Sequence, residues 1–365
     1  MNYDHFTSKE RSIYMSNGNY RRNHRRQRSS KRYRVRYDRI AAVVLVLVVF
    51  IVILTSCVKS CSKSDESSDK ENETTTAAAE TTQSSIIDNL DTSKQSDTIL
   101  TTAIDTLRPD ASQFVTETHA KTDVYRGNLV LVNSGNEYKF PADDTDPVTV
   151  YNNKANDYYN VSDYVIRLDK ETLSNIDNWM NDFYAAHKNT DVTIIGGFRT
   201  LEEQNDKFNS GYSSFRGGYT DYHTARTFDM GVFPKDGSSS GYYTPTGIYA
   251  WLDENAANYG FIQRFPAGKE SITGEQARTQ TYRYVGKPHA NYMKQNNLCL
   301  EEYIETIKSY TNTAPLEITV GQTLYQVYYV PASAEGNTDV PVPQNKSYTI
   351  SGNNSDGFIV TLTLN

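Results

Sequence analysis

The sequence predicts an α+β fold, because an amphipathic helix, buried strands and further helices follow one another within one continuous stretch. Between residues 172 and 186 the apolar side chains of Leu173, Ile176 and Met180 recur at helical spacing, which indicates a helix with one buried face. The run VTIIGGF at residues 192–198 is short and apolar, as expected of a buried strand. Neither pattern indicates a cofactor site, since each describes core packing.

The other elements follow from turn residues and apolar runs. A second helix is predicted for residues 246–259, with Gly260 at the position after a helix that favours glycine. The tail from Leu316 onward contains alternating or continuous apolar runs separated by prolines, which predicts a small β appendage. Further strands are predicted at residues 127–133, 261–264 and 281–285.

The N-terminal part differs from the rest in charge. Residues 1–39 carry twelve Lys and Arg against three Asp and Glu, although the whole chain has a net charge of −7. Residues 40–58 then form an apolar run close to the ~20 residues that a membrane-spanning helix needs. The basic arm on its N-terminal side predicts a single-pass protein in the cell membrane, with a cytoplasmic N-terminus and an extracytoplasmic C-terminal domain.

One alternative for this segment remains open. The residues LTSC, ending at Cys57, resemble a bacterial lipobox, which would make Cys57 a lipidated N-terminus, but the basic leader is long for a removed signal. No aromatic residue occurs from Cys57 to Gln113, and such a composition predicts disorder. The expected organisation is a basic cytoplasmic arm (1–39), a transmembrane helix (40–58), a disordered Ser/Thr/acidic linker (59–113), a folded domain (114–313) and a β extension (314–365).

Four blocks of the folded part carry a family resemblance. They are GGFRTLEEQ (196–204), GGYTDYHTARTFDMGV (217–232), YGFIQRFPAGKESITG (259–274) and TYRYVGKPHANYM (281–293). In this order they resemble the VanY-type D-alanyl-D-alanine carboxypeptidases, zinc peptidases that trim the stem peptides of bacterial cell walls. The resemblance covers about residues 125–310. It implies a VanY-like (hedgehog-like) α+β domain of mixed helices with a small antiparallel sheet.

The metal positions of the family are altered in this sequence. Members hold zinc with two histidines and an aspartate, and a glutamate serves as general base. The resemblance places Tyr222, Asp229 and Thr281 at the three ligand positions and Arg278 at the position of the base. Tyr and Thr are poor zinc ligands, and Arg cannot lose a proton. No zinc or other cofactor is therefore expected, and no catalytic or metal residue is assigned; zinc enters only if the metal site is rearranged.

Arg278 suggests a replacement for the metal. Its guanidinium is expected to fill the space of the zinc ion and to neutralise Asp229, which would otherwise be a buried, unpaired charge. The alternative is that Arg278 lies on a mobile loop and pairs with nothing. His223 and His289, the histidines within these blocks, are expected to be packing or surface residues rather than substitute ligands.

The binding residues of the family are better preserved. Arg199, Thr200 and Gln204 match the substrate-cleft element, and Thr220 matches a serine that precedes the first ligand. An arginine fork suits a terminal carboxylate, because it forms two charge-assisted hydrogen bonds. These four residues are the predicted substrate contacts.

Three functions are compatible with these observations. The favoured hypothesis is a membrane-tethered, catalytically degenerate VanY-like protein that binds peptidoglycan stem peptides or a cell-wall protein. One alternative is an active D,D- or L,D-carboxypeptidase with a rearranged zinc site, and the other is a tethered structural scaffold. The basic arm is expected to contact anionic lipids, and no nucleic-acid-binding module or phosphate-binding loop is present in the sequence.

Overall fold

The computed structural model describes residues 108–364. The predicted basic arm, the predicted transmembrane helix and all but the last six residues of the predicted linker lie outside the described residues. Among residues 108–364, no helix combines the length and the apolar character that a bilayer crossing requires.

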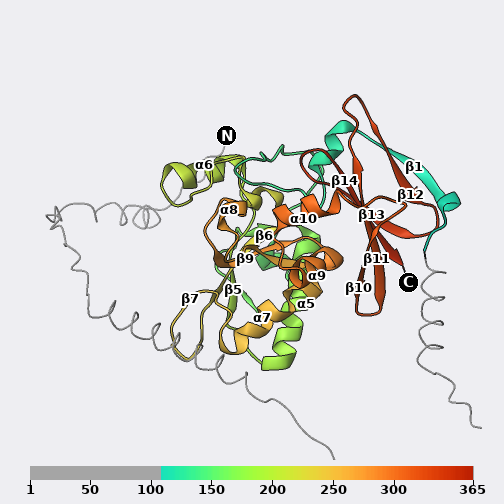
Figure 1. Cartoon of the computed structure of the whole chain (residues 1–365). Helices are drawn as coiled ribbons and strands as arrows, with labels where there is room; N and C mark the ends of the chain where they lie inside the picture. The colour runs from blue at the N-terminus through green and yellow to red at the C-terminus, as the bar shows by residue number, and fades with distance from the viewer. Residues whose placement is uncertain (1–107, 365) are drawn as a thin grey trace, which may run out of the picture. The chain divides into compact units, whose positions relative to one another are not determined.

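A mixed sheet of six strands forms the centre of the VanY-like part (Figure 1). The strand order is β3-β5-β6-β9-β8, and β7 pairs with the end of β6. β3 runs parallel to β5, and the other neighbours are antiparallel. The strands are β3 (Asn160–Val161), β5 (Val192–Gly196), β6 (Thr227–Val232), β7 (Gly241–Tyr242), β8 (Phe261–Phe265) and β9 (Arg278–Tyr284), and a separate ribbon pairs β2 (Val148–Thr149) with β4 (Arg167–Leu168). The strands predicted at 192–198, 261–264 and 281–285 are thus confirmed.

Helix α5 (Lys170–His187) confirms the predicted amphipathic helix. It begins after Asp169, whose carboxylate accepts hydrogen bonds from the N–H groups of Glu171 and Thr172. The second predicted helix is interrupted, and it ends before Gly260, which has φ 85° as a glycine after a helix allows. The remaining helices are α4 (Val150–Asn153), α6 (Leu201–Asn209), α7 (Ala250–Asn255), α8 (Glu270–Thr273), α9 (Lys287–Gln295) and α10 (Leu300–Ile307), with 3-10 turns η1 (Ala111–Gln113), η2 (Lys121–Tyr125), η3 (Asp221–Thr224), η4 (Gly247–Tyr249) and η5 (Ala256–Tyr259).

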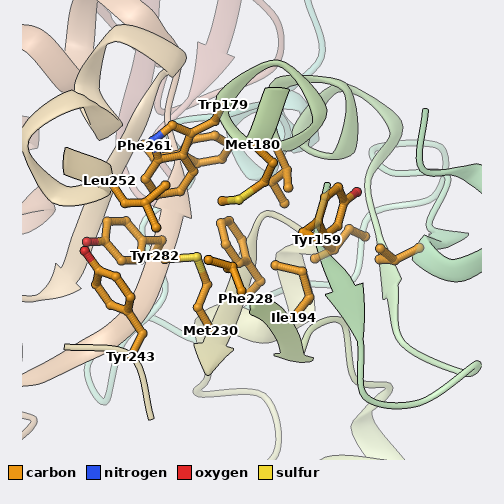
Figure 2. Close-up of a cluster of buried hydrophobic side chains, with 14 of the residues drawn as sticks. Tyr159, Trp179, Met180, Ile194, Phe228, Met230, Tyr243, Leu252, Phe261 and Tyr282 are labelled. Atoms are coloured by element: carbon orange, nitrogen blue, oxygen red, sulfur yellow. The ribbon is translucent and has the colours of Figure 1, made fainter. Parts of the chain in front are cut away.

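The main core lies between α5 and one face of this sheet. Figure 2 shows Trp179 and Met180 of α5 together with Phe228 and Met230 of β6, all fully buried. Because successive side chains of a strand point to opposite faces, Asp229 lies on the other face of β6, away from this core. The sheet therefore separates a packing face from a face that is available for chemistry.

The segment 127–133 corrects a prediction, since its residues 129–132 are buried but it is not a strand. Three of its backbone carbonyl groups are satisfied by buried guanidinium groups instead of a neighbouring strand, and that of Leu131 accepts from Asn354 Nδ2. Arg283 donates to the carbonyl oxygens of Asn128 and Val130, and Arg264 donates to that of Val132. These side-chain donors take the place of a strand partner, which a local apolar run cannot reveal.

The two arginines are held by buried carboxylates. Asp221 accepts from Arg264 Nε and Arg283 Nη1, both at 2.7 Å, and the three side chains are at most 1% exposed. Glu301 of α10 also pairs with Arg264, at 2.8 Å. This network joins η3, β8, β9 and α10, so it fixes the position of η3 beside the sheet.

The C-terminal β unit confirms the predicted appendage and extends it. It has the strand order β10-β11-β14-β13, all antiparallel. One face packs on α9 and α10, and the other is covered by a ribbon of β1 and β12. Residues 114–119 form β1, which pairs with β12 of the C-terminal part although it precedes the VanY-like part in the chain. The strands are β1 (Phe114–His119), β10 (Leu316–Val320), β11 (Thr323–Pro331), β12 (Thr338–Pro343), β13 (Ser347–Gly352) and β14 (Gly357–Leu364).

Candidate functional site

Asp229 occupies the middle of the sheet. In the register of β6 it lies opposite Gly196 on β5 and Thr281 on β9. A Cβ atom on Gly196 would stand 2.8 Å from Asp229 Oδ2, so the missing side chain of Gly196 leaves room for the carboxylate. The local sequence therefore holds a carboxylate on the face of the sheet that is not used by the main core.

Tyr222 reaches this carboxylate from η3. Its hydroxyl donates to the carboxylate of Asp229, with 2.8 Å to each of the two oxygens. The ring is 1% exposed, and Ala225 at φ 59° ends η3 and returns the chain to β6. Burial, together with the neighbouring Asp229 carboxylate, raises the pKa of Tyr222 well above its ordinary value. The phenol is consequently a neutral hydrogen-bond donor.

Thr281 approaches from the other neighbouring strand. Its Oγ1 donates to Asp229 Oδ1 at 2.6 Å, and its side chain is fully buried. We call Tyr222, Asp229 and Thr281 the Asp229 cluster. The three positions that the resemblance aligned with metal ligands thus meet at one carboxylate, where two hydroxyl groups donate to it.

The Asp229 cluster does not fit zinc. Catalytic zinc sites use three ligands from His, Cys, Asp or Glu, and two of the three side chains here are neutral hydroxyls that donate to the third. The donor set offers a single anionic ligand at this point.

Arg278 corrects the hypothesis of an ion pair with Asp229. Its Nη2 donates to Ser214 Oγ at 3.1 Å and to Glu275 Oε2 at 3.3 Å, and in the part of the chain that the structure describes its only ion pair is with Glu275. The guanidinium also lies over the ring of Phe215, 4.8 Å from the centroid. Glu275 offers a negative charge three residues away, whereas the carboxylate of Asp229 already accepts two hydroxyls. The alternative that Arg278 pairs with nothing is equally wrong.

A different arginine lies next to the Asp229 cluster. The guanidinium carbon of Arg199 is 4.0 Å from the centroid of the Tyr222 ring, and its Nη1 donates to Gln204 Oε1 at 3.0 Å. Gln204 is buried and donates in turn to Ser213 Oγ and to the carbonyl oxygen of Phe215. These bonds tie the start of α6 to the loop before η3 and set the position of Arg199.

The other predicted substrate contacts divide into two kinds. Thr200 is the N-cap of α6, and its Oγ1 accepts from the N–H of Glu203 at 3.2 Å, which is a structural use of the side chain. Thr220 precedes η3, and its buried Oγ1 has no hydrogen-bond partner among the described residues. A buried hydroxyl without a partner is costly, so the Thr220 hydroxyl has hydrogen-bonding capacity that no described residue uses.

Both histidines of the blocks pack, as predicted. His223 Nδ1 lies 2.7 Å from the carbonyl oxygen of Arg199, and its Nε2 accepts from the N–H of Gly218 at 3.0 Å. His289 contacts Tyr303 and Thr361 through its two ring nitrogens. His223 lies on the 3-10 turn η3, and these two backbone contacts set the direction of its ring.

A cavity of about 190 Å³ lies on the Arg278 side of the site. Its main residues could not be predicted from local sequence patterns, because Phe215 and Glu275 belong to loops whose role depends on their partners. Phe215 stacks on Phe265 with 5.7 Å between ring centroids, and Arg278 lies over this pair. The lining residues are Val132, Asn133, Ser134, Ser214, Phe215, Arg216, Tyr219, Asp221, Phe265, Thr273 and Glu275.

Comparison with known proteins agrees with the resemblance. A sequence profile of VanY, D-alanyl-D-alanine carboxypeptidase, matches residues 165–287. A D-alanyl-D-alanine carboxypeptidase of Enterococcus faecium is 31% identical over 249 residues, which cover 67% of this chain and 78% of the relative. Another from Enterococcus faecalis is 30% identical over 148 residues, or 36% of this chain and 55% of the relative.

A solved structure supports the same fold. The vancomycin resistance D,D-dipeptidase VanXYg, in complex with a D-Ala-D-Ala phosphinate analog, superposes with a TM-score of 0.59 at 26% identity. The match covers 68% of this chain and 99% of that chain. The chain therefore belongs to the VanY D-alanyl-D-alanine carboxypeptidase family.

Proposed function

We propose that this chain is a catalytically degenerate member of its family that binds D-Ala-D-Ala-terminated stem peptides of peptidoglycan at the outer face of the cell membrane. The observation that carries the proposal is the Asp229 cluster, in which Tyr222 and Thr281 both donate to the carboxylate. The oxygens of this carboxylate already accept hydrogen bonds from two hydroxyl groups, so the carboxylate does not need a metal ion as a partner.

The loss of hydrolysis follows from the chemistry of the same residues. Zinc peptidases need an open coordination position on the metal to produce a nucleophilic water, and the cluster supplies only one anionic ligand. A general base must also accept a proton from that water. Arg278 stands at the position of the base in the aligned family pattern, and a guanidinium has no acceptor.

The capacity to bind a peptide depends on other residues. Arg199 lies over Tyr222 beside the cluster, and Thr220 holds a buried hydroxyl without a partner in the described part of the chain. A guanidinium binds a terminal carboxylate through two parallel hydrogen bonds. The VanXYg relative was solved with a D-Ala-D-Ala analog, which supports a ligand of this class for the corresponding surface here.

Attachment to the membrane is part of the proposal and depends on the sequence alone. Residues 40–58 supply an apolar run of nearly bilayer length, preceded by the basic arm. The tether would place the binding domain where cell-wall precursors are exposed.

The experiment uses the full chain purified in detergent micelles. Zinc is measured by mass spectrometry, D-alanine release from a pentapeptide by an amino-acid assay, and binding of the same peptide by calorimetry. We expect substoichiometric zinc, no D-alanine release above the blank, and binding that Arg199→Gln weakens by about tenfold, roughly 1.4 kcal/mol.

A matched variant tests the metal assay. Tyr222→His, Thr281→His and Arg278→Glu together restore the family pattern, so this triple variant should retain about one zinc ion per chain where the unmodified chain retains none. Stoichiometric zinc in the unmodified chain, or D-alanine release by it, would establish the active carboxypeptidase instead. Absence of peptide binding would leave the scaffold alternative.

A further inference from the structure

A second cleft, whose lining includes no residue of the Asp229 cluster, lies between the VanY-like part and the C-terminal β unit. Its volume is about 510 Å³, within the ~300–1,000 Å³ typical of small-molecule sites, and domain junctions are where such sites often form. One wall comes from the start of α5, the end of β9 and the start of α9, and the other from β11, β13 and β14. Figure 1 shows these C-terminal strands beside α9 and α10.

The two walls are fixed to each other by a shared core. Met293 of α9 and Leu300 of α10 belong to the same buried cluster as Val327 of β11 and Ile359 of β14. A cleft whose walls share a hydrophobic core is preformed, so a ligand there does not have to bring two mobile parts together.

The strand wall presents hydroxyl groups. Tyr325 pairs with Thr363 across β11 and β14, and Thr349 pairs with Thr361 across β13 and β14. Paired residues share one face of a sheet, and Thr361 and Thr363 are two residues apart, so all four side chains lie on the same face. Thr361 contacts His289 Nε2 at 3.1 Å, but within residues 108–364 no hydrogen bond engages the side chain of Tyr325, Thr349 or Thr363.

The opposite wall is polar and close to neutral. Glu171 accepts from the hydroxyl of Tyr284 at 2.8 Å and from Asn128 Nδ2 at 3.1 Å, so its carboxylate is already solvated by protein groups. Lys287 at the start of α9 is exposed, and no ion pair engages it in the described part of the chain. One lysine and one glutamate give the lining no net charge, which does not favour a phosphate or another polyanion.

We propose that this cleft binds a neutral, hydroxyl-rich ligand, namely a short glycan of N-acetylated pyranose rings. The free hydroxyls of Thr349, Thr363 and Tyr325 can each donate and accept, as sugar hydroxyl and acetamido groups do. The ring of Tyr325 adds an apolar face with a polar tip, which suits the apolar face of a pyranose. This inference goes beyond the proposed function, because it concerns a different cleft and a different part of a cell-wall polymer.

The test is calorimetric titration of the full chain in micelles with chitotetraose. We expect saturable binding that the double variant Thr349→Val/Thr363→Val weakens at least about tenfold, since Val keeps the shape of Thr and removes its hydroxyl. Thr319→Val is the matched control, because Thr319 is exposed on β10 and pairs with Leu324, whose side chain packs on the other face of the same sheet.

The outcomes separate this inference from the proposed function. Chitotetraose binding that survives Arg199→Gln, together with loss in the double variant, supports a distinct glycan cleft. No saturable binding of chitotetraose by the unmodified chain overturns it, even if the stem peptide binds. Equal weakening by Thr319→Val would also overturn it, because the effect would then not come from the cleft.

Discussion

The substitution Asp221→Asn tests whether the buried ionic network holds the site in place. Asp221 is the shared partner of Arg264 and Arg283, with 2.7 Å to each, and all three side chains are buried from water. Asparagine keeps the shape of the side chain but removes its negative charge. The two guanidinium groups then keep their positive charges in a region without solvent.

The magnitude follows from what each arginine keeps. Arg264 retains Glu301 at 2.8 Å, whereas Arg283 retains only backbone carbonyl oxygens. Removing one partner of a buried ion pair costs about 3–5 kcal/mol. Because Asp221 serves two arginines and only one has a second carboxylate, we expect a loss near the upper end, about 5 kcal/mol. Native domains have ~5–15 kcal/mol in total, so the variant is expected to be close to unfolding.

The assay is urea unfolding followed by tryptophan fluorescence, since Trp179 is fully buried. Asp146→Asn is the control, because it removes an exposed pair with Lys170 and should change the free energy of unfolding by less than about 1 kcal/mol. If Asp221→Asn costs less than about 1.5 kcal/mol, or no more than the control, the arginines are not held by this charge and the reasoning fails.

Two further predictions concern buried polar groups. Burial lowers the pKa of His289 to about 3, whereas its pKa in the unfolded chain is near 6.5, so below about pH 6.5 the unfolded chain binds the extra proton and the free energy of unfolding should fall. The measurement is the free energy of unfolding of the unmodified chain and of His289→Gln at pH 7 and pH 4.5. An equal change between the two pH values in both chains would contradict the prediction. Tyr222→Phe and Thr281→Val should each lower the free energy of unfolding by about 1.5–3 kcal/mol, because each removes a donor to a charged acceptor. Both losses should largely disappear when Asp229 is replaced by Ala in the same chain. Undiminished losses in Asp229→Ala would show that the hydroxyls stabilise something else.

Local patterns in the sequence determined most of the regular structure. Helix α5 and strands β5 and β8 could be predicted from short-range periodicity alone. The reason is that the spacing of the apolar residues along the chain determines which face of an element is buried. The four ordered blocks also aligned Tyr222, Asp229 and Thr281, and the fold brings these three side chains together.

Long-range partners, in contrast, could be decided only by the tertiary structure. The run at 127–133 has the composition of a strand, yet three of its carbonyl groups are bonded by Arg264 and Arg283, which lie more than 130 residues away. Likewise β1 completes a unit whose other strands begin after residue 315, and Arg278 contacts Glu275 and Phe215 rather than Asp229. Spacing along the chain encodes which face of an element is apolar, but the choice among several charged or hydrogen-bonding partners depends on distances that exist only once the chain has folded.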